Sequence, residues 1–535
     1  MPSPQSNGTK PSTPVESFGW AIAAWVRRNS NQTQATGAQV PNSTSAATPV
    51  ATTALKSVAA SQTSLTSTTA PAAATASTNP LSAFLSAITT IFTPRSSKPL
   101  TLAAGTASVG KPNTTTGAVT GSLNFKGTSS TAPTYSVTTQ PTYGTVTVNS
   151  NGTFTYTPTK LARDTSAVSA NQTTATFTVL ASSGSSTASE TVTVPVLATT
   201  INGDSTAVLQ NVFSNLAPNS TLTMAAKTFY HSGVLRIEAA GITINGNGAT
   251  LQATNDATSA VEIVADHVSV SNMTFGANQT GPRYGALEQH KLVIGGNYDS
   301  VSKVTINGAA GAGVFVNGAG WFTLSGVTVN NSRADGIHMT NGAHDGTVTD
   351  AVTNNTGDDG IAIVSYIPDG NICRNITINN PTVNGTIWGR GVSVVGGQNI
   401  TYNNIKVSKT NAAGIYIAAE PSYNTMGVNG VIVNGGTVTG ANYNASVVHG
   451  AILVYSGNTG QPVTNVTIEN LSVSGTASTA QRQLGLILDS GATASAINFK
   501  NLTFAKSSLS TFYTNAPKID YTSSNILVGG TLIQI

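Results

Sequence analysis

A short sequence unit recurs through the second half of the chain and constrains its fold more than any other feature. The unit is a glycine followed by aliphatic residues at alternate positions, as in GVFV, GIHM, GIAI, GVSV and GIYI. A second strand-like run such as VTVNN or ITINN follows most of these units. Repeats of 20 to 50 residues with several short strands each are typical of a solenoid. The glycines lie 23 to 36 residues apart and are Gly313, Gly336, Gly360, Gly391, Gly414, Gly450 and Gly485.

This period predicts a parallel β-helix of about ten coils over residues 199–535. Strands of successive coils stack about 4.8 Å apart, with alternate side chains pointing into a shared core. We expect Ile and Val to fill that core and asparagine side chains to hydrogen-bond at the bends. Asn331, Asn355, Asn380 and Asn404 are predicted to stack one repeat apart. A β-propeller is excluded, because its blades have a period of about 40–45 residues.

The composition agrees with a neutral solenoid and excludes several classes of protein. Charged residues are 8% of the 535 residues, against about 25% in ordinary soluble domains. The net charge of +4 comes from residues 1–97, and the rest of the chain is balanced. No basic cluster with interleaved aromatic residues occurs there, so we expect no nucleic-acid partner. The long uncharged stretches are Ser/Thr-rich and predict no membrane span, and Cys373 has no partner for a disulfide.

Two further segments precede the solenoid. Residues 1–97 are rich in Ser, Thr, Ala and Pro and predict a disordered tail. Residues 98–198 contain short runs in which Val, Thr, Tyr and Phe alternate with polar residues, and an SNG turn separates two of them. Such runs predict a β-sandwich. The phrase PTYGTVTVNSNGTFTYTP resembles the immunoglobulin- or cadherin-like repeats of bacterial surface proteins. The predicted fold class is therefore all-β.

Stacking places residues with the same offset from the repeat glycine above one another. The residue before the glycine is Asp335, Asp359 and Arg390 in three consecutive coils, with Asp358 beside Asp359. His338 follows Gly336 by two residues and is predicted to point outward. Because carboxylates are scarce in this chain, we take Asp335, Asp358 and Asp359 as the candidate catalytic residues.

Carboxylates stacked about 5 Å apart repel each other, so one of them should have a raised pKa and keep a proton near neutrality. A protonated carboxylate beside an ionised one is suited to acid–base chemistry at a glycosidic bond. An aspartate ladder in the turns, or a calcium site along the stack, would produce the same residue pattern.

These segments resemble a known family. RADGIH (333–338), GDDGIAI (357–363) and GRGVSVVGG (389–397) resemble three of the four signature motifs of polygalacturonase-type glycoside hydrolases, NTDG, DD and GHG. The resemblance implies a pectate-lyase-like right-handed parallel β-helix over about residues 200–520. It also implies inverting hydrolysis without a cofactor or metal, in which Asp358 is the general acid. Asp335 and Asp359 would activate the water.

The motifs depart from the family at three points. RAD replaces NTD, Arg390 replaces the histidine of GHG, and YIA (416–418) stands where the family has RIK. The missing cations read the substrate carboxylate in pectin-cutting members. Plain pectin is therefore not the expected substrate. The motifs are consistent with either a neutral glycan or a differently charged one.

Six further residues are predicted to contact the glycan. Aromatic rings stack on sugar rings, and charged or polar groups bind hydroxyls or carboxylates. The predicted substrate-binding residues are His338, Tyr366, Trp388, Arg390, Tyr416 and Glu420.

The sequence thus predicts a polysaccharide glycoside hydrolase, secreted or on a bacterial cell surface and monomeric, with a polysaccharide as its partner. Two alternatives stay open. One is a non-catalytic adhesin or glycan-binding β-helix protein. The other is a polysaccharide lyase or epimerase that uses Arg390 as base and the three aspartates as calcium ligands.

Overall fold

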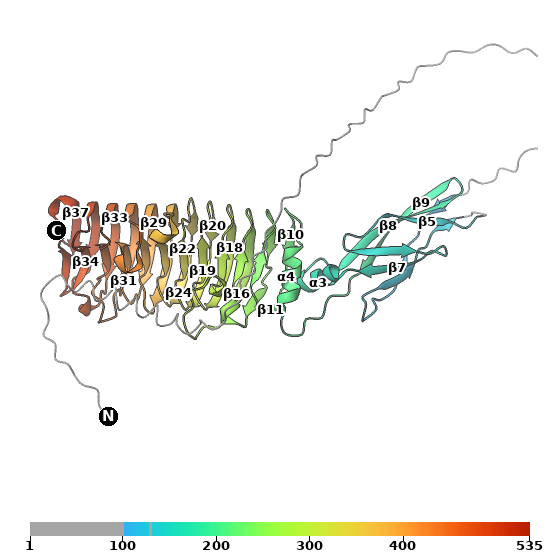
Figure 1. Ribbon diagram of the computed structural model, residues 1–535, viewed down its shortest axis with the longest axis horizontal. Helices are drawn as coiled ribbons and strands as arrows, with labels where there is room; N and C mark the ends of the chain where they lie inside the picture. The colour runs from blue at the N-terminus through green and yellow to red at the C-terminus, as the bar shows by residue number, and fades with distance from the viewer. Residues whose placement is uncertain (1–100, 128–130) are drawn as a thin grey trace, which may run out of the picture.

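The computed structural model describes residues 101–127 and 131–535, so the predicted disordered tail lies outside the described residues. These residues form a small β-sandwich followed by a long solenoid (Figure 1). Two α-helices lie where the two parts meet, α3 (Lys160–Val168) and α4 (Thr206–Ser214). In this part of the chain no helix has both the length and the apolarity that crossing a membrane needs. Short 3-10 turns are η1 (Asp256–Thr258), η2 (Leu287–Gln289), η3 (Ile367–Asp369), η4 (Pro421–Tyr423), η5 (Ser478–Ala480) and η6 (Lys518–Asp520).

Two antiparallel sheets and a short strand pair make up the N-terminal part. Their shared core includes Phe154 and Phe177, one from each sheet, whose rings are 5.2 Å apart. The sandwich is thus present, while its likeness to immunoglobulin or cadherin repeats stays a prediction. One sheet contains β2 (Ser108–Val109), β3 (Val119–Ser122), β6 (Gly144–Val148) and β7 (Thr153–Pro158), the other β5 (Thr134–Thr139), β8 (Thr174–Ser183) and β9 (Ser186–Pro195), and β1 (Leu102–Ala103) pairs with β4 (Lys126–Gly127).

Helix α4 covers the first coil of the solenoid. Its Leu209 and Phe213 are buried in the solenoid core, and Val168 of α3 belongs to the same core. Asp164 of α3 is fully buried and accepts a hydrogen bond from Asn211 of α4 at 2.7 Å. The sandwich is therefore attached to the solenoid by a shared core rather than by a bare linker.

The solenoid has two parallel faces. One is an eleven-stranded sheet that contributes one strand to each coil, so the chain forms eleven coils where about ten are predicted. Its strands are β12 (Leu235–Ile237), β15 (Val261–Ile263), β17 (Leu292–Ile294), β19 (Val314–Asn317), β22 (Ile337–Thr340), β25 (Ile361–Val364), β28 (Val392–Val395), β30 (Ile415–Ala419), β32 (Ile452–Ser456), β34 (Arg482–Leu488) and β36 (Ser510–Thr514).

The other face is an eighteen-stranded sheet that bends once per coil. In some coils the bend separates two short strands, and in others, both early and late, one long strand runs through it. At the C-terminal end the last two strands pair antiparallel. The strands are β10 (Thr221–Thr223), β11 (Thr228–His231), β13 (Thr243–Asn245), β14 (Thr250–Ala253), β16 (Ser269–Gly276), β18 (Ser300–Ala309), β20 (Thr323–Ser325), β21 (Thr328–Ser332), β23 (Thr347–Thr349), β24 (Val352–Thr356), β26 (Arg374–Asn379), β27 (Thr382–Thr386), β29 (Gly397–Ser408), β31 (Val428–Thr439), β33 (Val463–Ser474), β35 (Ala494–Phe504), β37 (Tyr521–Val528) and β38 (Thr531–Ile533).

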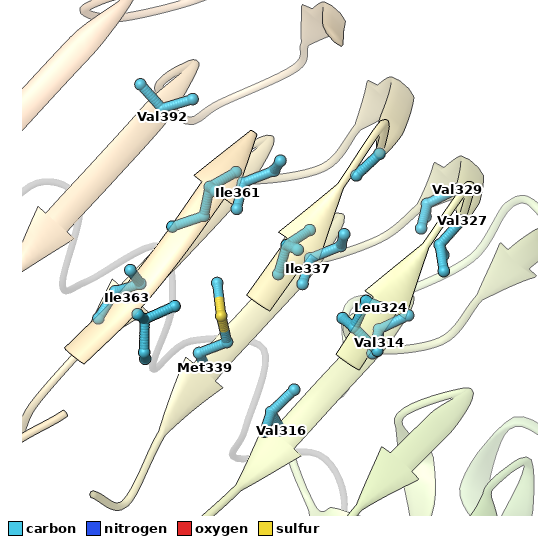
Figure 2. Packing of buried hydrophobic residues seen from close by; sticks show 14 of the residues in the cluster. Val314, Val316, Leu324, Val327, Val329, Ile337, Met339, Ile361, Ile363 and Val392 are labelled. Atoms are coloured by element: carbon cyan, nitrogen blue, oxygen red, sulfur yellow. The ribbon is translucent and has the colours of Figure 1, made fainter. Parts of the chain in front are cut away.

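The core consists of stacked columns of aliphatic side chains. Ile337, Ile361 and Val392 occupy the same place in three consecutive coils, as the strand register requires (Figure 2). Each is at most 1% exposed. Burying one such side chain stabilises the fold by about 1.5–3 kcal/mol, so the columns supply most of the solenoid's stability.

The register corrects the last two repeat glycines. Ile415 pairs with Ile452, which places Ala451 rather than Gly450 at the repeat position. Gly485 pairs with Leu453 and lies within strand β34. The prediction was wrong here because a Gly next to an aliphatic run also occurs by chance in a Gly-rich chain.

The asparagine ladders form at the bends, but not as one series. Asn355 donates to Asn331 at 2.9 Å near the ends of strands β24 and β21. Asn404 donates to Asn380 at 3.2 Å at the bend within the long face. The predicted single stack is therefore two stacks at two corners. Both corners have a left-handed backbone, which asparagine adopts more readily than most residues.

Asn470 tests what such a corner contributes. It donates to Asn434 at 2.7 Å, accepts from Asn501 at 2.9 Å and has a φ of 61°. Asn470→Ala should lower the free energy of unfolding by about 2 kcal/mol, because hydrogen bonds and a favourable left-handed residue are both lost. Asn470→Gly, which keeps the backbone conformation, should lose about half of that. Equal losses in chemical denaturation would show that the backbone conformation contributes nothing.

Lys291 is an exception in the core. It takes the place of a repeat glycine before β17 and is fully buried, and its Nζ donates to the Ser259 carbonyl at 2.9 Å. Its Nζ also lies 3.0 Å from His231 Nε2. Burial lowers the pKa of Lys291 to about 7, and burial together with Lys291 lowers the pKa of His231 to about 3.

The depressed pKa of Lys291 predicts a pH-dependent stability. Between pH 7 and about 10 the unfolded chain binds a proton at Lys291 that the native state does not, so stability rises with pH. The slope from this group approaches about 1.4 kcal/mol per pH unit. Lys291→Met should remove this rise when unfolding free energies are measured from pH 7 to 9.5. Parallel curves for the two proteins would contradict the assignment.

Candidate functional site

The three candidate aspartates lie at the start of two neighbouring strands of the eleven-stranded sheet. Asp335 precedes β22, and Asp358 and Asp359 precede β25. The strand register places Asp335, Asp359 and Arg390 in one column over three coils. One carboxylate oxygen from each of the three aspartates lies within 4.8 Å of the others.

The carboxylates of the column are also part of the stacking. Asp335 Oδ1 accepts the backbone N–H of Asp359 at 2.9 Å. Asp359 Oδ1 accepts the backbone N–H of Arg390 at 2.7 Å. One oxygen of each carboxylate therefore holds the next coil, and the other oxygen faces its charged neighbours.

Each aspartate has its own positively charged or donor partner. His338 Nδ1 lies 2.8 Å from Asp335 Oδ2, and Arg283 Nη1 lies 2.7 Å from Asp358 Oδ2. Asp359 Oδ2 accepts from the Ser393 hydroxyl at 2.6 Å and lies 3.5 Å from Arg390 Nη1. His338 comes from the outward side of β22, as predicted, whereas the loop that carries Arg283 lies outside every motif. These partners already balance charge that a cation would otherwise neutralise.

The surroundings shift the pKa values of Asp359 and Asp335 in opposite directions. For Asp359, burial raises the pKa, and the nearby charges of Asp358 and Asp335 add to it, while Arg390 opposes them. For Asp335, burial acts in the same direction, but the hydrogen bond and charge of His338 outweigh it and the pKa is lowered. The site therefore contains two carboxyl groups whose pKa values are shifted in opposite directions.

A second cluster continues the column. Arg390 Nη2 lies 2.5 Å from Glu420 Oε1, and the Tyr416 hydroxyl donates to the same oxygen at 2.8 Å. The guanidinium carbon is 4.3 Å from the centre of the Tyr416 ring. Arg390 is thus bound between Asp359 and Glu420, with 11% of its side chain exposed. Its predicted role in substrate binding stays a prediction.

The two remaining predicted residues lie beside this cluster. Tyr366 follows β25 and packs against the apolar outer face that contains Ala362 and Tyr416. Trp388 lies in the turn before Arg390, and its side chain is 48% exposed. The structure thus joins His338 and Arg390 to the aspartates by direct contacts. Tyr416 and Glu420 are linked to them through Arg390, and the two outer aromatic residues lie at the edge.

Sequence inspection missed Arg283 and the ring stack next to the site. The rings of Phe315 and His338 are 5.2 Å apart and parallel, and His290 stacks on Phe315 at 3.9 Å. The stack was detectable, because Phe315 and His338 have the same offset from their repeat glycines. No such signal existed for Arg283, which lies in an insertion between coils.

Removing Arg390 tests the charge balance. Arg390→Met leaves Asp359 and Glu420 without their shared cation, and breaking a buried pair in this way costs about 3–5 kcal/mol. Arg390→Met with Asp359→Asn should recover part of the loss in chemical denaturation. Arg236→Gln removes an arginine whose side chain is 44% exposed from its pair with Glu262. It should cost less than Arg390→Met, because water reaches this pair from the arginine side. Equal losses for the two arginines would refute the assignment.

The comparisons with known proteins concern the fold. Residues 312–499 match the family model of the right handed beta helix region. The comparison with curated protein sequences finds no match. Among solved structures, the catalytic domain of a GH87 alpha-1,3-glucanase variant in complex with tetrasaccharides is 15% identical. It covers 80% of this chain and 84% of its own, with a TM-score of 0.47.

Two more solved structures show comparable similarity. The polygalacturonase from Erwinia carotovora ssp. carotovora is 16% identical and covers 60% of this chain and 95% of its own, with a TM-score of 0.44. The Streptococcus pneumoniae surface protein and adhesin PfbA is 12% identical and covers 61% of this chain and 96% of its own, with a TM-score of 0.42. The match over 312–499 supplies the hand of the coils, and the solenoid of this chain is a right-handed parallel β-helix.

Proposed function

We propose that this chain is a polysaccharide glycoside hydrolase whose site is the aspartate trio at the start of β22 and β25. The observation that carries the proposal is the gathering of three buried carboxyl groups, one oxygen of each within 4.8 Å of the others. Among them, His338 lowers the pKa of Asp335 against the effect of burial. Hydrolysis of a glycosidic bond needs one carboxyl group to give a proton and another to receive one.

The roles follow the motif resemblance. Asp358 donates the proton to the leaving oxygen, and Asp335 and Asp359 hold and activate the water. Asp335 is suited to accept a proton, because His338 stabilises its ionised form.

Inversion is the proposed stereochemical course, in line with the same resemblance. The short distance between the carboxyl groups, within 4.8 Å, would by itself favour retention. Inverting enzymes place their two carboxyl groups about 6.5–9.5 Å apart. The water therefore has to be held by the Asp335–Asp359 pair, with Asp358 acting from the side.

We propose a neutral glycan as the substrate. Four carboxylates gather here with two arginines: Asp335, Asp358, Asp359 and Glu420 against Arg283 and Arg390. Both arginines are already paired with these carboxylates, so neither is available to bind the carboxylate of an acidic sugar. The same contacts disfavour a lyase with Arg390 as base, because Arg390 is bound by two carboxylates and its pKa is raised well above the usual value.

Turnover by the full chain tests the hydrolase. Incubated with neutral and acidic polysaccharides, it should release reducing ends from a neutral glycan without forming unsaturated products. Asp358→Asn, Asp359→Asn and Asp335→Asn should each lower kcat by at least about 100-fold, the scale of one acid–base group. Glycan binding without turnover would support the adhesin, and calcium-dependent unsaturated ends would support the lyase.

Aryl glycosides of the released sugar distinguish the proton donor, Asp358, from the water-activating residue Asp335. A good leaving group needs no proton, so Asp358→Asn should regain much of its activity on such substrates, whereas Asp335→Asn should not. NMR of the first product should show the inverted anomer. Recovery by Asp335→Asn instead, or a retained anomer, would contradict the assigned roles.

A further inference from the structure

One insertion interrupts the regular coils beside the site. Residues 277–291 connect β16 to β17, whereas residues 310–313 make the equivalent connection from β18 to β19. The insertion contains Arg283, the arginine that pairs with Asp358. Asn278 and Pro282 within it are exposed, so packing in the core does not determine its path.

Arg333 binds this insertion. Its Nη1 donates to the Pro282 carbonyl at 2.8 Å, and its Nη2 donates to the Asn278 carbonyl at 3.2 Å. The same Nη2 lies 2.7 Å from Asp256 Oδ2. The side chain of Arg333 is 5% exposed. One buried guanidinium thus joins two carbonyls of the insertion to the carboxylate of Asp256, which lies three coils earlier.

These contacts fix the backbone on one side of Arg283, and a second contact fixes the other side. The Tyr284 N–H donates to the Ala310 carbonyl at 2.9 Å. Arg283 therefore lies between two anchored neighbours, and its guanidinium reaches Asp358 at 2.7 Å with 18% of the side chain exposed.

We infer that Arg333 is a positioning residue that holds segment 278–284 over the site and so sets the ion pair between Arg283 and Asp358. The inference rests on the proposed function for its catalytic meaning. Arg333 stands where the resembling family has the asparagine of NTD. The arginine at this motif position thus has a structural task, which is to hold segment 278–284.

The consequence concerns the protonation of Asp358. A guanidinium next to a carboxylate favours the charged form, whereas the proposed acid must be protonated to act. The charged and titratable groups around Asp358 are Arg283 from the insertion, Asp335 and His338 from the coil of β22, its neighbour Asp359, and Arg390 from the coil of β28. Of these, Arg283 alone comes from outside the repeat, so segment 278–284 adjusts the acid without altering the stack.

Two variants loosen the segment in different ways. Arg333→Met removes the guanidinium but keeps an apolar stem. Gly281→Ala keeps the arginine in the sequence, but the added Cβ would lie 2.5 Å from Arg333 Nη1 and displace the guanidinium. The φ of 128° at Gly281 also strains any other residue there, so this variant loosens the segment directly as well. Arg236→Gln is the control, because it removes an arginine–carboxylate pair elsewhere on the same sheet.

The first measurement needs no turnover. In the native full chain, trypsin should cut after Arg283 at least about tenfold faster in Arg333→Met and Gly281→Ala than in wild type, because local opening exposes the bond. Arg236→Gln should match wild type, and Arg283→Gln should lack the fragment. Unchanged cleavage in both test variants would overturn the positioning role.

The second measurement concerns Asp358. In Arg333→Met and Arg283→Gln, the midpoint of one proton uptake on acidification should rise by about 1 pH unit or more relative to wild type. In an Asp358→Asn background the difference should vanish. The alkaline limb of the pH profile of kcat/KM should move in the same direction. In Arg333→Lys the midpoint should lie between those of wild type and Arg333→Met.

The outcomes separate this inference from the proposed function. A wild-type chain without turnover refutes the hydrolase, while cleavage and proton uptake still decide the role of Arg333. Faster cleavage with an unchanged midpoint would overturn the link between the segment and Asp358.

Discussion

Hydrogen bonding between coils in strict register is the constraint on which the rest of the structure depends. The pairing of Ile337 with Ile361 and of Ile361 with Val392 brings each residue to the same place in its coil as its partners. A slip of one residue would turn these side chains outward and separate the aspartates. The apolar columns make such a slip costly, because every strand of the stack would lose its buried face.

The same stack brings the residues of the candidate site together, and its stability offsets the cost of burying them. Burying three carboxyl groups is unfavourable unless each has partners. Those partners come from several coils and from both sides of the column: His338, Arg283, Ser393 and Arg390. Because Asp335 and Asp359 have different partners, their pKa values move in opposite directions.

The departures from the family motifs become intelligible in the structure. Arg390 is bound between Asp359 and Glu420, and Arg333 is bound to the insertion at 278–282. Both arginines fill positions that the resembling family gives to other residues. Both guanidinium groups are paired with carboxylates of the protein itself. They therefore do not take over the task of the RIK cations, which bind the substrate carboxylate in the resembling family.

The repeat of glycine and alternating aliphatic residues determined the solenoid by itself, because stacking demands one residue pattern in every coil. For the same reason, the column of Asp335, Asp359 and Arg390 followed from their offsets alone. The separation of the asparagines into two corners and the true repeat positions near Gly450 did not follow, because similar intervals and glycines occur at more than one bend. Arg283 was beyond sequence inspection altogether. It lies 75 residues from Asp358 in a segment without periodicity, so the two residues meet only in the tertiary structure.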